Sequence, residues 1–313
     1  MRVTNQGMLN NYLNNLNRNL TKLTKYQGQL SSGKEIQRPS DDPFAVTRSM
    51  SLITSINKNN QYLENIKDSM GWTDMTDSAL GSIGDILNRV RELIIQGANG
   101  PLNDSDREAA LDEVKQLIDQ VAQIGNTNYD GRYIFGGQET TETPFSVEKA
   151  KDPVTNIDQI ILKYNGDTSM LKREVSQNVT IEVNIPGNWI MYGKNGDLSV
   201  DLATTLNNII GALESGEAED LESLGGELLG QLDEHIDNVL ALRSEIGAKH
   251  NRLEAAQSKN KEETYNMTEL LSKTEDIDFA EKIMEYMNMQ AVYMASLSTG
   301  AKILQPTLLD FLR

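Results

Sequence analysis

Several residue types and patterns are missing from this chain of 313 residues, and each absence excludes a class of protein. There is no cysteine, so a disulfide framework and any metal site built from thiolates are excluded. No apolar run approaches the roughly 18 residues of a membrane-spanning helix, and Met1–Met8 contains no apolar signal-peptide core. Few aromatic residues and seven prolines favour long helical rods. We therefore expect neither a membrane span nor a cleaved signal peptide.

Positive charge is also scarce. The chain carries 46 acidic and 29 basic residues, which gives a formal net charge of -17. This balance repels nucleic acid and anionic membranes, and no cluster of lysine and arginine offsets it. We expect neither of them as a partner.

Residues and motifs of common catalytic and binding sites are few. The only histidines are His235 and His250, and no glycine-rich phosphate loop is present. His250 falls on an apolar seam, which predicts a packed or partly exposed helical residue. Asn126–Gly131 imitates the first half of an EF-hand loop, but the twelfth position is Gly137, where calcium needs a bidentate glutamate. We predict no catalytic residue, no cofactor and no metal.

Two apolar seams, one near each end, are the clearest positive feature. Apolar residues recur at alternating spacings of four and three, which is the pattern of a coiled coil. The N-terminal seam comprises Leu9, Leu13, Leu16, Leu20, Leu23, Gln27 and Leu30. The C-terminal seam comprises Ile283, Met287, Gln290, Met294, Leu297, Ala301, Leu304 and Leu308. A narrow seam needs a partner helix, so these seams should pack on each other or on copies in neighbouring molecules.

Helices and a β insertion are predicted between the seams. Gly33 should end the first helix, Pro39 and Pro43 prevent its continuation, and Asp41 or Asp42 should cap the next. Apolar periodicity predicts helices over residues 8–31, 43–94, 104–124, 202–213, 229–271 and 279–308. Asp276 and Asp278 are interpreted as further caps rather than as acid-base groups.

Strand signals occupy the region from Pro144 to about Trp189. Ile157–Tyr164 is rich in β-branched and apolar residues, and Asn165–Gly166 predicts a hairpin turn after it. Val179–Ile185 alternates with a period of two. Whether these strands form one sheet or a small barrel stays open.

The predicted fold is mainly α. We expect an elongated antiparallel coiled coil or helical bundle formed by the N- and C-terminal parts, with a small inserted β domain. The expected parts are a terminal coiled-coil assembly domain, a helical rod and an outer β domain, at residues 1–43 with 272–313, 44–143 with 196–271, and 144–195.

The segments beside the seams resemble the bacterial flagellin family. The resemblance rests on Leu30–Arg38, with the sequence LSSGKEIQR, and on the closing Leu308–Arg313, LLDFLR. The family motif is assigned to Ser32, Gly33, Arg38, Pro39, Ser40, Asp41, Asp42 and Pro43. Three features are more similar to family members at the hook-filament junction than to filament subunits. They are the prolines of the motif, the stretch Asn128–Gly137 before Pro144, and the ending from Ala301.

The resemblance implies a structural, non-enzymatic protein of the extracellular flagellum. It implies type III export without a cleaved signal, and terminal helices that form the inner tube. The partners implied are copies of itself, hook-associated protein 1, flagellin, and a cytosolic export chaperone on the C-terminal helix. A short filament flagellin is the alternative within the family, and an intracellular coiled-coil scaffold is the alternative outside it.

Overall fold

A computed structural model describes residues 5–99, 104–151, 158–194, 196–216 and 218–303. The chain divides into two compact units. The terminal unit comprises Met1–Asn59 and Glu262–Arg313, and the central unit comprises Asn60–Lys261. The three-part division expected from the sequence stays a prediction.

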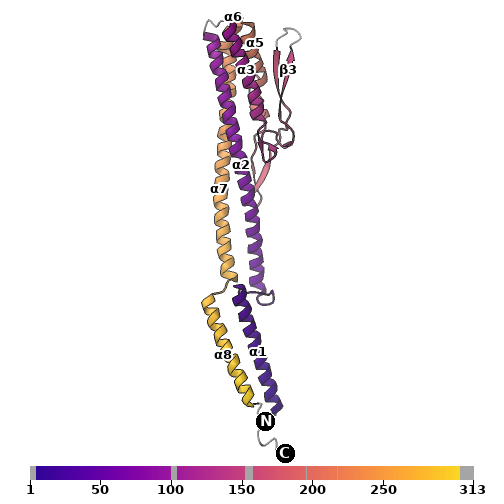
Figure 1. Cartoon of the computed structure of the whole chain (residues 1–313), viewed down its shortest axis with the longest axis vertical. Coiled ribbons are helices and arrows are strands. Elements are labelled where there is room, and N and C mark those ends of the chain that lie inside the picture. The colour runs from indigo at the N-terminus through magenta and orange to yellow at the C-terminus, as the bar shows by residue number, and fades with distance from the viewer. Residues whose placement is uncertain (1–4, 100–103, 152–157, 195, 217, 304–313) are drawn as a thin grey trace, which may run out of the picture. The chain divides into compact units, whose positions relative to one another are not determined.

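Helices dominate the described chain (Figure 1). They are α1 (Asn5–Ser32), α2 (Pro43–Asn99), α3 (Asp104–Gly125), α4 (Asn188–Tyr192), α5 (Leu202–Ser215), α6 (Ala218–Ser223), α7 (Leu229–Glu275) and α8 (Phe279–Ile303), with a π-helical turn at Leu224–Leu228. The predicted helices are confirmed within the described residues. The mainly α fold class, with long terminal helices that pack together and a small insertion of short strands, is confirmed as well.

The helix ends follow the predicted capping chemistry. Gly33 has a φ of 71°, and its N–H donates to the Gln29 carbonyl at 2.8 Å, which closes α1. The Asp42 carboxylate accepts two backbone N–H bonds at the start of α2, at 3.0 and 3.1 Å. Asp278 does the same at the start of α8, at 2.9 and 3.3 Å. The interpretation of Asp42 and Asp278 as helix caps is confirmed. Asp276 instead accepts a bond from the Ser272 hydroxyl at 2.6 Å.

The strands form three separate two-stranded antiparallel sheets in the described chain. Their bounds are β1 (Asn128–Tyr129), β2 (Arg132–Tyr133), β3 (Phe145–Lys151), β4 (Asp158–Tyr164), β5 (Lys172–Ser176) and β6 (Val179–Glu182). β1 pairs with β2, β3 with β4, and β5 with β6. The EF-hand-like stretch therefore contains a small hairpin.

The predicted hairpin turn at Asn165–Gly166 is wrong. β4 pairs back onto β3, with Phe145 opposite Tyr164, so the chain leaves the sheet at this point. The Asn165 N–H donates to the Pro144 carbonyl at 2.8 Å, beyond the end of the ladder. A two-residue hairpin turn of this sequence needs positive φ values, and Gly166 does not have one. The dipeptide ends a strand instead of joining two paired strands.

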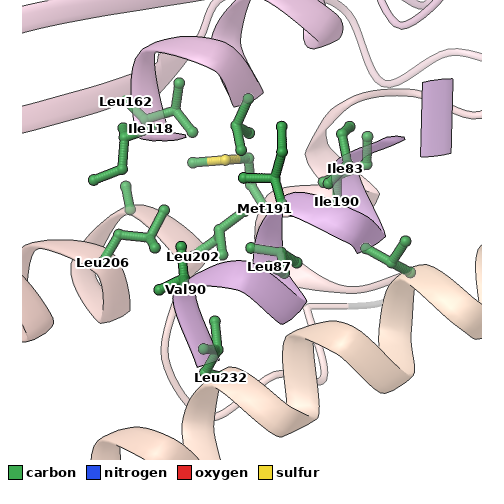
Figure 2. Packing of buried hydrophobic residues seen from close by; sticks show 14 of the residues in the cluster. Ile83, Leu87, Val90, Ile118, Leu162, Ile190, Met191, Leu202, Leu206 and Leu232 are labelled. Atoms are coloured by element: carbon green, nitrogen blue, oxygen red, sulfur yellow. The ribbon is translucent and has the colours of Figure 1, made fainter. Parts of the chain in front are cut away.

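One large apolar core lies in the central unit (Figure 2). Leu87 of α2, Ile118 of α3, Leu206 of α5 and Met191 of α4 are each at most 1% exposed. Leu162 brings β4 onto the same core. Burying each such side chain contributes about 1.5–3 kcal/mol, so the central unit is stabilised from within.

Within the central unit, α2 also packs on α7. Arg243 pairs with Asp77 at 3.1 Å. The Nδ1 atom of His250 lies 3.2 Å from the Thr73 hydroxyl and 3.0 Å from the Asp74 carboxylate. The His250 side chain is 29% exposed, so its prediction as a partly exposed helical residue is confirmed.

Candidate assembly interface

The two ends of the chain meet in the terminal unit, where α1 and α8 lie side by side (Figure 1). The Tyr12 hydroxyl donates to the Ser296 carbonyl at 2.9 Å. Further along α1, the Tyr26 ring lies 5.8 Å from the Lys282 ammonium. Early residues of α1 thus contact late residues of α8, so the helices run antiparallel, as predicted.

The face that pairs is rich in tyrosine and polar residues. On α1 the partly buried positions recur at spacings of three and four; they are Leu9, Tyr12, Leu16, Asn19, Leu23, Tyr26 and Leu30. On α8 the corresponding positions are Lys282, Tyr286, Met289, Tyr293, Ser296 and Gly300, of which Gly300 is buried. A Cβ at Gly300 would lie within 2.0 Å of the Tyr12 hydroxyl. Glycine therefore lets the two helices approach here.

The predicted N-terminal seam is split between this face and the exposed surface. Leu9, Leu16 and Leu23 are partly buried, as is Leu30. Leu13 and Leu20 are 44% and 43% exposed, and Gln27 is exposed too. Every second position of the seam is thus exposed.

The predicted C-terminal seam lies outside the paired face altogether. Ile283, Met287, Met294 and Leu297 are 42%, 62%, 60% and 40% exposed, and Ala301 and Gln290 are exposed as well. Leu304 and Leu308 lie outside the described residues. Each residue turns an α-helix by about 100°, so a shift of one position along α8 separates the packed face from the predicted seam.

An open apolar stripe results. We use this name for Leu13 and Leu20 of α1 with Ile283, Met284, Met287, Met294 and Leu297 of α8, each at least 40% exposed. Contiguous exposed apolar surface on a soluble protein marks an interaction site. Unbranched methionine side chains adapt to irregular partners. The arrangement can bind apolar helices, and it holds no reactive constellation among its described residues.

The family motif lies at a second contact between the chain's two ends. Lys34 and Asp276 form an isolated antiparallel β-bridge, and Lys34 also pairs with Glu275. The Glu35 N–H donates to the Glu275 carbonyl at 2.6 Å, and the Ile277 N–H donates to the Gly33 carbonyl at 3.1 Å. Sequence reasoning missed this link, because a bridge of one residue pair leaves no periodic signal.

The remaining motif residues shape the loop into α2. The Asp41 carboxylate accepts the Arg38 N–H at 3.2 Å, and Pro43 opens the helix. The Ser32 hydroxyl accepts a bond from the Lys34 N–H at 3.2 Å. Pro39 and Ser40 are exposed. These contacts give the motif a local structural role.

Charged groups at the α1–α8 junction are paired. Lys282 lies 3.0 Å from Glu285 and 3.5 Å from Glu35. The hydrogen bond to Glu285 is the main reason that the pKa of Lys282 is raised.

The described residues contain no group of three acidic or histidine side chains placed to hold a metal ion. None of their helices is long and apolar enough to cross a membrane.

These observations first define a class. The chain is a mainly helical protein whose two ends meet in one unit, and short strands are inserted between its helices.

Comparison with known families then gives a narrower assignment. Residues 3–140 match the bacterial flagellin N-terminal helical region, and residues 229–312 match the bacterial flagellin C-terminal helical region. The chain therefore belongs to the bacterial flagellin family of structural proteins, which confirms the resemblance seen in the sequence.

Individual relatives cover nearly the whole chain. Flagellar hook-associated protein 3 of Escherichia coli strain K12 is 27% identical over 95% of both chains. Flagellin of Bacillus subtilis strain 168 is 25% identical over 95% of this chain and 94% of its own. The crystal structure of flagellar hook-associated protein 3 from Legionella pneumophila shares the fold, with a TM-score of 0.61, 16% identity, and coverage of 72% of this chain and 98% of that one.

Proposed function

We propose that this chain is a structural protein of the bacterial flagellum that forms the junction between hook and filament. Its similarity to hook-associated protein 3 along almost its full length supports the junction role. The observation that carries the mechanism is the open apolar stripe, whose methionines on α8 are about 60% exposed. A stripe this exposed in the single chain is consistent with assembly through the terminal helices.

Assembly would bury the stripe against neighbouring subunits. Each square ångström of apolar surface removed from water contributes about 25 cal/mol, so many small contacts add up along two helices. The pairing of α1 with α8 leaves this surface available, because on α8 that contact uses an adjacent, more polar face and on α1 it leaves Leu13 and Leu20 exposed. The seams from Leu9 to Leu30 and from Ile283 to Leu308 are thus proposed as the polymerising surfaces, through those of their residues that the α1–α8 contact leaves exposed. The family motif is proposed to hold the two ends of the chain together beside them.

The proposed partners are copies of this chain, hook-associated protein 1, flagellin, and a chaperone that covers the C-terminal helix before export. The proposed location is the extracellular flagellum, reached through the flagellar export apparatus without a cleaved signal. A non-enzymatic role fits the family. We further propose that residues 1–43 with 272–313 form the inner-tube assembly domain, residues 44–143 with 196–271 the helical rod domain, and residues 144–195 the outer β domain.

A charge placed in the stripe tests the proposal. Leu297→Asp and Met294→Asp should leave the chain folded and exported but absent from flagella, because a buried unpaired carboxylate is strongly unfavourable. Asn288→Asp adds the same charge at an exposed polar position of α8 and should assemble normally. The readouts are the amounts of each variant in sheared flagella and in the medium. Normal assembly of Leu297→Asp would contradict the mechanism.

A filament flagellin is the second candidate, and the similarity to Bacillus subtilis flagellin supports it. The two candidates differ in abundance and in deletion phenotype. A junction protein should be a trace component of sheared filaments, and its deletion should release monomeric flagellin into the medium. A chain that dominates the filament mass would select the flagellin role instead.

A further inference from the structure

The central unit contains a cleft. It has a volume of about 490 Å³ and is enclosed by α2, the β1–β2 hairpin and the β5–β6 pair. Its lining includes Asp68, Trp72, Tyr129, Arg132 and Arg173. Clefts of a few hundred cubic ångströms commonly bind ligands or partner side chains.

Two guanidinium groups in this cleft have no partner. Within the described chain, Arg132 and Arg173 make no hydrogen bond or ion pair through their side chains. Three other arginines of the central unit, Arg89, Arg91 and Arg243, each pair with a carboxylate. Arg252, which does not line the cleft, resembles the cleft arginines in having no such partner among the described residues. Forked donors of this kind bind carboxylates through two parallel hydrogen bonds.

A buried donor in the same cleft is also unsatisfied. Trp72 is 4% exposed, and its indole N–H has no acceptor among the described residues. The Tyr129 ring packs on the indole edge-to-face at 6.1 Å. The indole nitrogen is itself inaccessible, so an occupant does not reach this donor, and the arginine side chains carry the binding chemistry of the cleft.

These features favour an acidic peptide over other occupants. Stacking of a sugar would need an open aromatic face, which the buried Trp72 does not offer. Asp68 and Asp130 also line the cleft, so they disfavour an occupant that is anionic at every repeat, such as nucleic acid, and leave room for one or two carboxylates opposite the arginines. Leu171 and Val183 add apolar surface. An extended segment with carboxylates beside an apolar side chain matches both parts of the lining.

We propose that the cleft docks a carboxylate-bearing segment of a second copy of this chain. The inference rests on the proposed assembly, which places copies beside one another. Each copy carries 46 acidic residues against 29 basic ones, so neighbouring copies offer an excess of carboxylates and repel one another unless local attractions exist. The two unpartnered arginines supply such an attraction.

Photo-crosslinking in assembled flagella tests the docking. Benzoylphenylalanine replaces Asp68, an exposed lining residue, in the full-length chain. Illumination of sheared flagella should yield a covalent dimer of this chain, with the adduct in an acidic peptide of the second copy. Adding Arg132→Glu and Arg173→Glu should lower the dimer yield by about tenfold or more, because like charges repel at close range.

Arg252→Glu is the matched control, since Arg252 is exposed in the same unit and does not line the cleft. It should leave the dimer yield unchanged. Three outcomes would each overturn the docking. The first is an adduct to a different protein, and the second is no adduct although the benzoylphenylalanine chain is present in flagella. The third is a dimer yield that Arg132→Glu and Arg173→Glu do not lower. Loss of the crosslinker variant from flagella, beside normal incorporation of the parent chain, would also overturn it, because a cleft that docks copies should tolerate a probe at its rim. Failure of the parent chain itself to enter flagella would instead refute the proposed function.

Discussion

The central and terminal units bury their apolar residues very differently. In the central unit Leu80, Leu87 and Ile94 of α2 are fully buried. In the terminal unit Met287 and Met294 of α8 are 62% and 60% exposed. The first unit is completed by its own chain, whereas the second presents apolar surface that its own chain does not cover.

This difference indicates a division of labour. A closed core gives a unit stability that does not depend on concentration. An open helix pair is stabilised by whatever binds it, since binding to the folded form adds stability by mass action. The same chain thus combines a self-sufficient part with a part whose stability should rise on assembly.

Amide exchange should show the largest contrast. In the monomer we expect residues 80–94 to exchange at least about a thousandfold more slowly than residues 9–30, because core helices open only with global unfolding. Hydrogen exchange measured by mass spectrometry checks this. Equal protection of the two segments in a verified monomer would contradict the comparison.

Truncation of a core leucine should have the next largest effect. Leu87→Ala should lower the free energy of unfolding by about 2–5 kcal/mol, since it leaves a cavity in a closed core. Leu20→Ala removes the same atoms at a position that is 43% exposed, and it should change monomer stability by less than about 0.5 kcal/mol. Urea unfolding of both variants provides the measurement. A similar loss in both would show that α1 is as closed as the central core.

Acid should weaken the central unit through His235. Burial lowers the pKa of His235, and the nearby Asp201 and Glu234 only partly oppose this. The unfolded chain then binds a proton that the folded chain resists. The contribution of neutral His235 to the free energy of unfolding is therefore fully present above the unfolded pKa of about 6.5. It is lost as the pH drops below that value.

His235→Gln should remove this component. Each unit by which the folded pKa is lowered accounts for about 1.4 kcal/mol, so the parent chain should lose more stability than the variant between about pH 7 and about pH 5. Urea unfolding at both pH values measures the difference. Identical losses would mean that the histidine is protonated as easily in the fold as outside it.

The smallest effect is expected from the surface pair between α2 and α7. Arg243 and Asp77 lie 3.1 Å apart, with side chains 42% and 45% exposed. A double-mutant cycle with Arg243→Ala and Asp77→Ala should give a coupling of about 0.2–1 kcal/mol, lower at high salt. A coupling above this range would mean that an exposed ion pair contributes as much as core residues do.

The sequence predicted the helices and the meeting of the two ends, but not which face pairs. Leu9, Leu16 and Leu23 belong both to the predicted seam and to the observed face, so heptad spacing alone did not separate the two. Tyr12 and Tyr26 favour the observed pairing of faces, because they contact Ser296 and Lys282 of α8. The apolar periodicity of a helix predicts that one of its faces will be buried. In the single chain, polar side-chain contacts decide which face of α8 packs on α1.

Strand pairing and the cleft were beyond the sequence for related reasons. Asn165–Gly166 has hairpin composition, yet pairing of β4 with β3 decides how the chain continues. Arg132 and Arg173 are 41 residues apart in the numbering and carry no shared motif. They line the same cleft only because the fold brings the β1–β2 hairpin and β5 together. Local sequence signals predict the conformation of single segments. Which distant segments contact one another depends on the three-dimensional fold.

The exposed methionines of α8 have a consequence for chemical ageing. Oxidation converts the thioether of Met284, Met287 or Met294 into a polar sulfoxide. At about 60% exposure these sulfur-bearing side chains are open to oxidants in the single chain. If assembly covers them, the same reagents will reach them slowly. Peroxide treatment would then record the history of each subunit, marking chains left outside the polymer and sparing those within it.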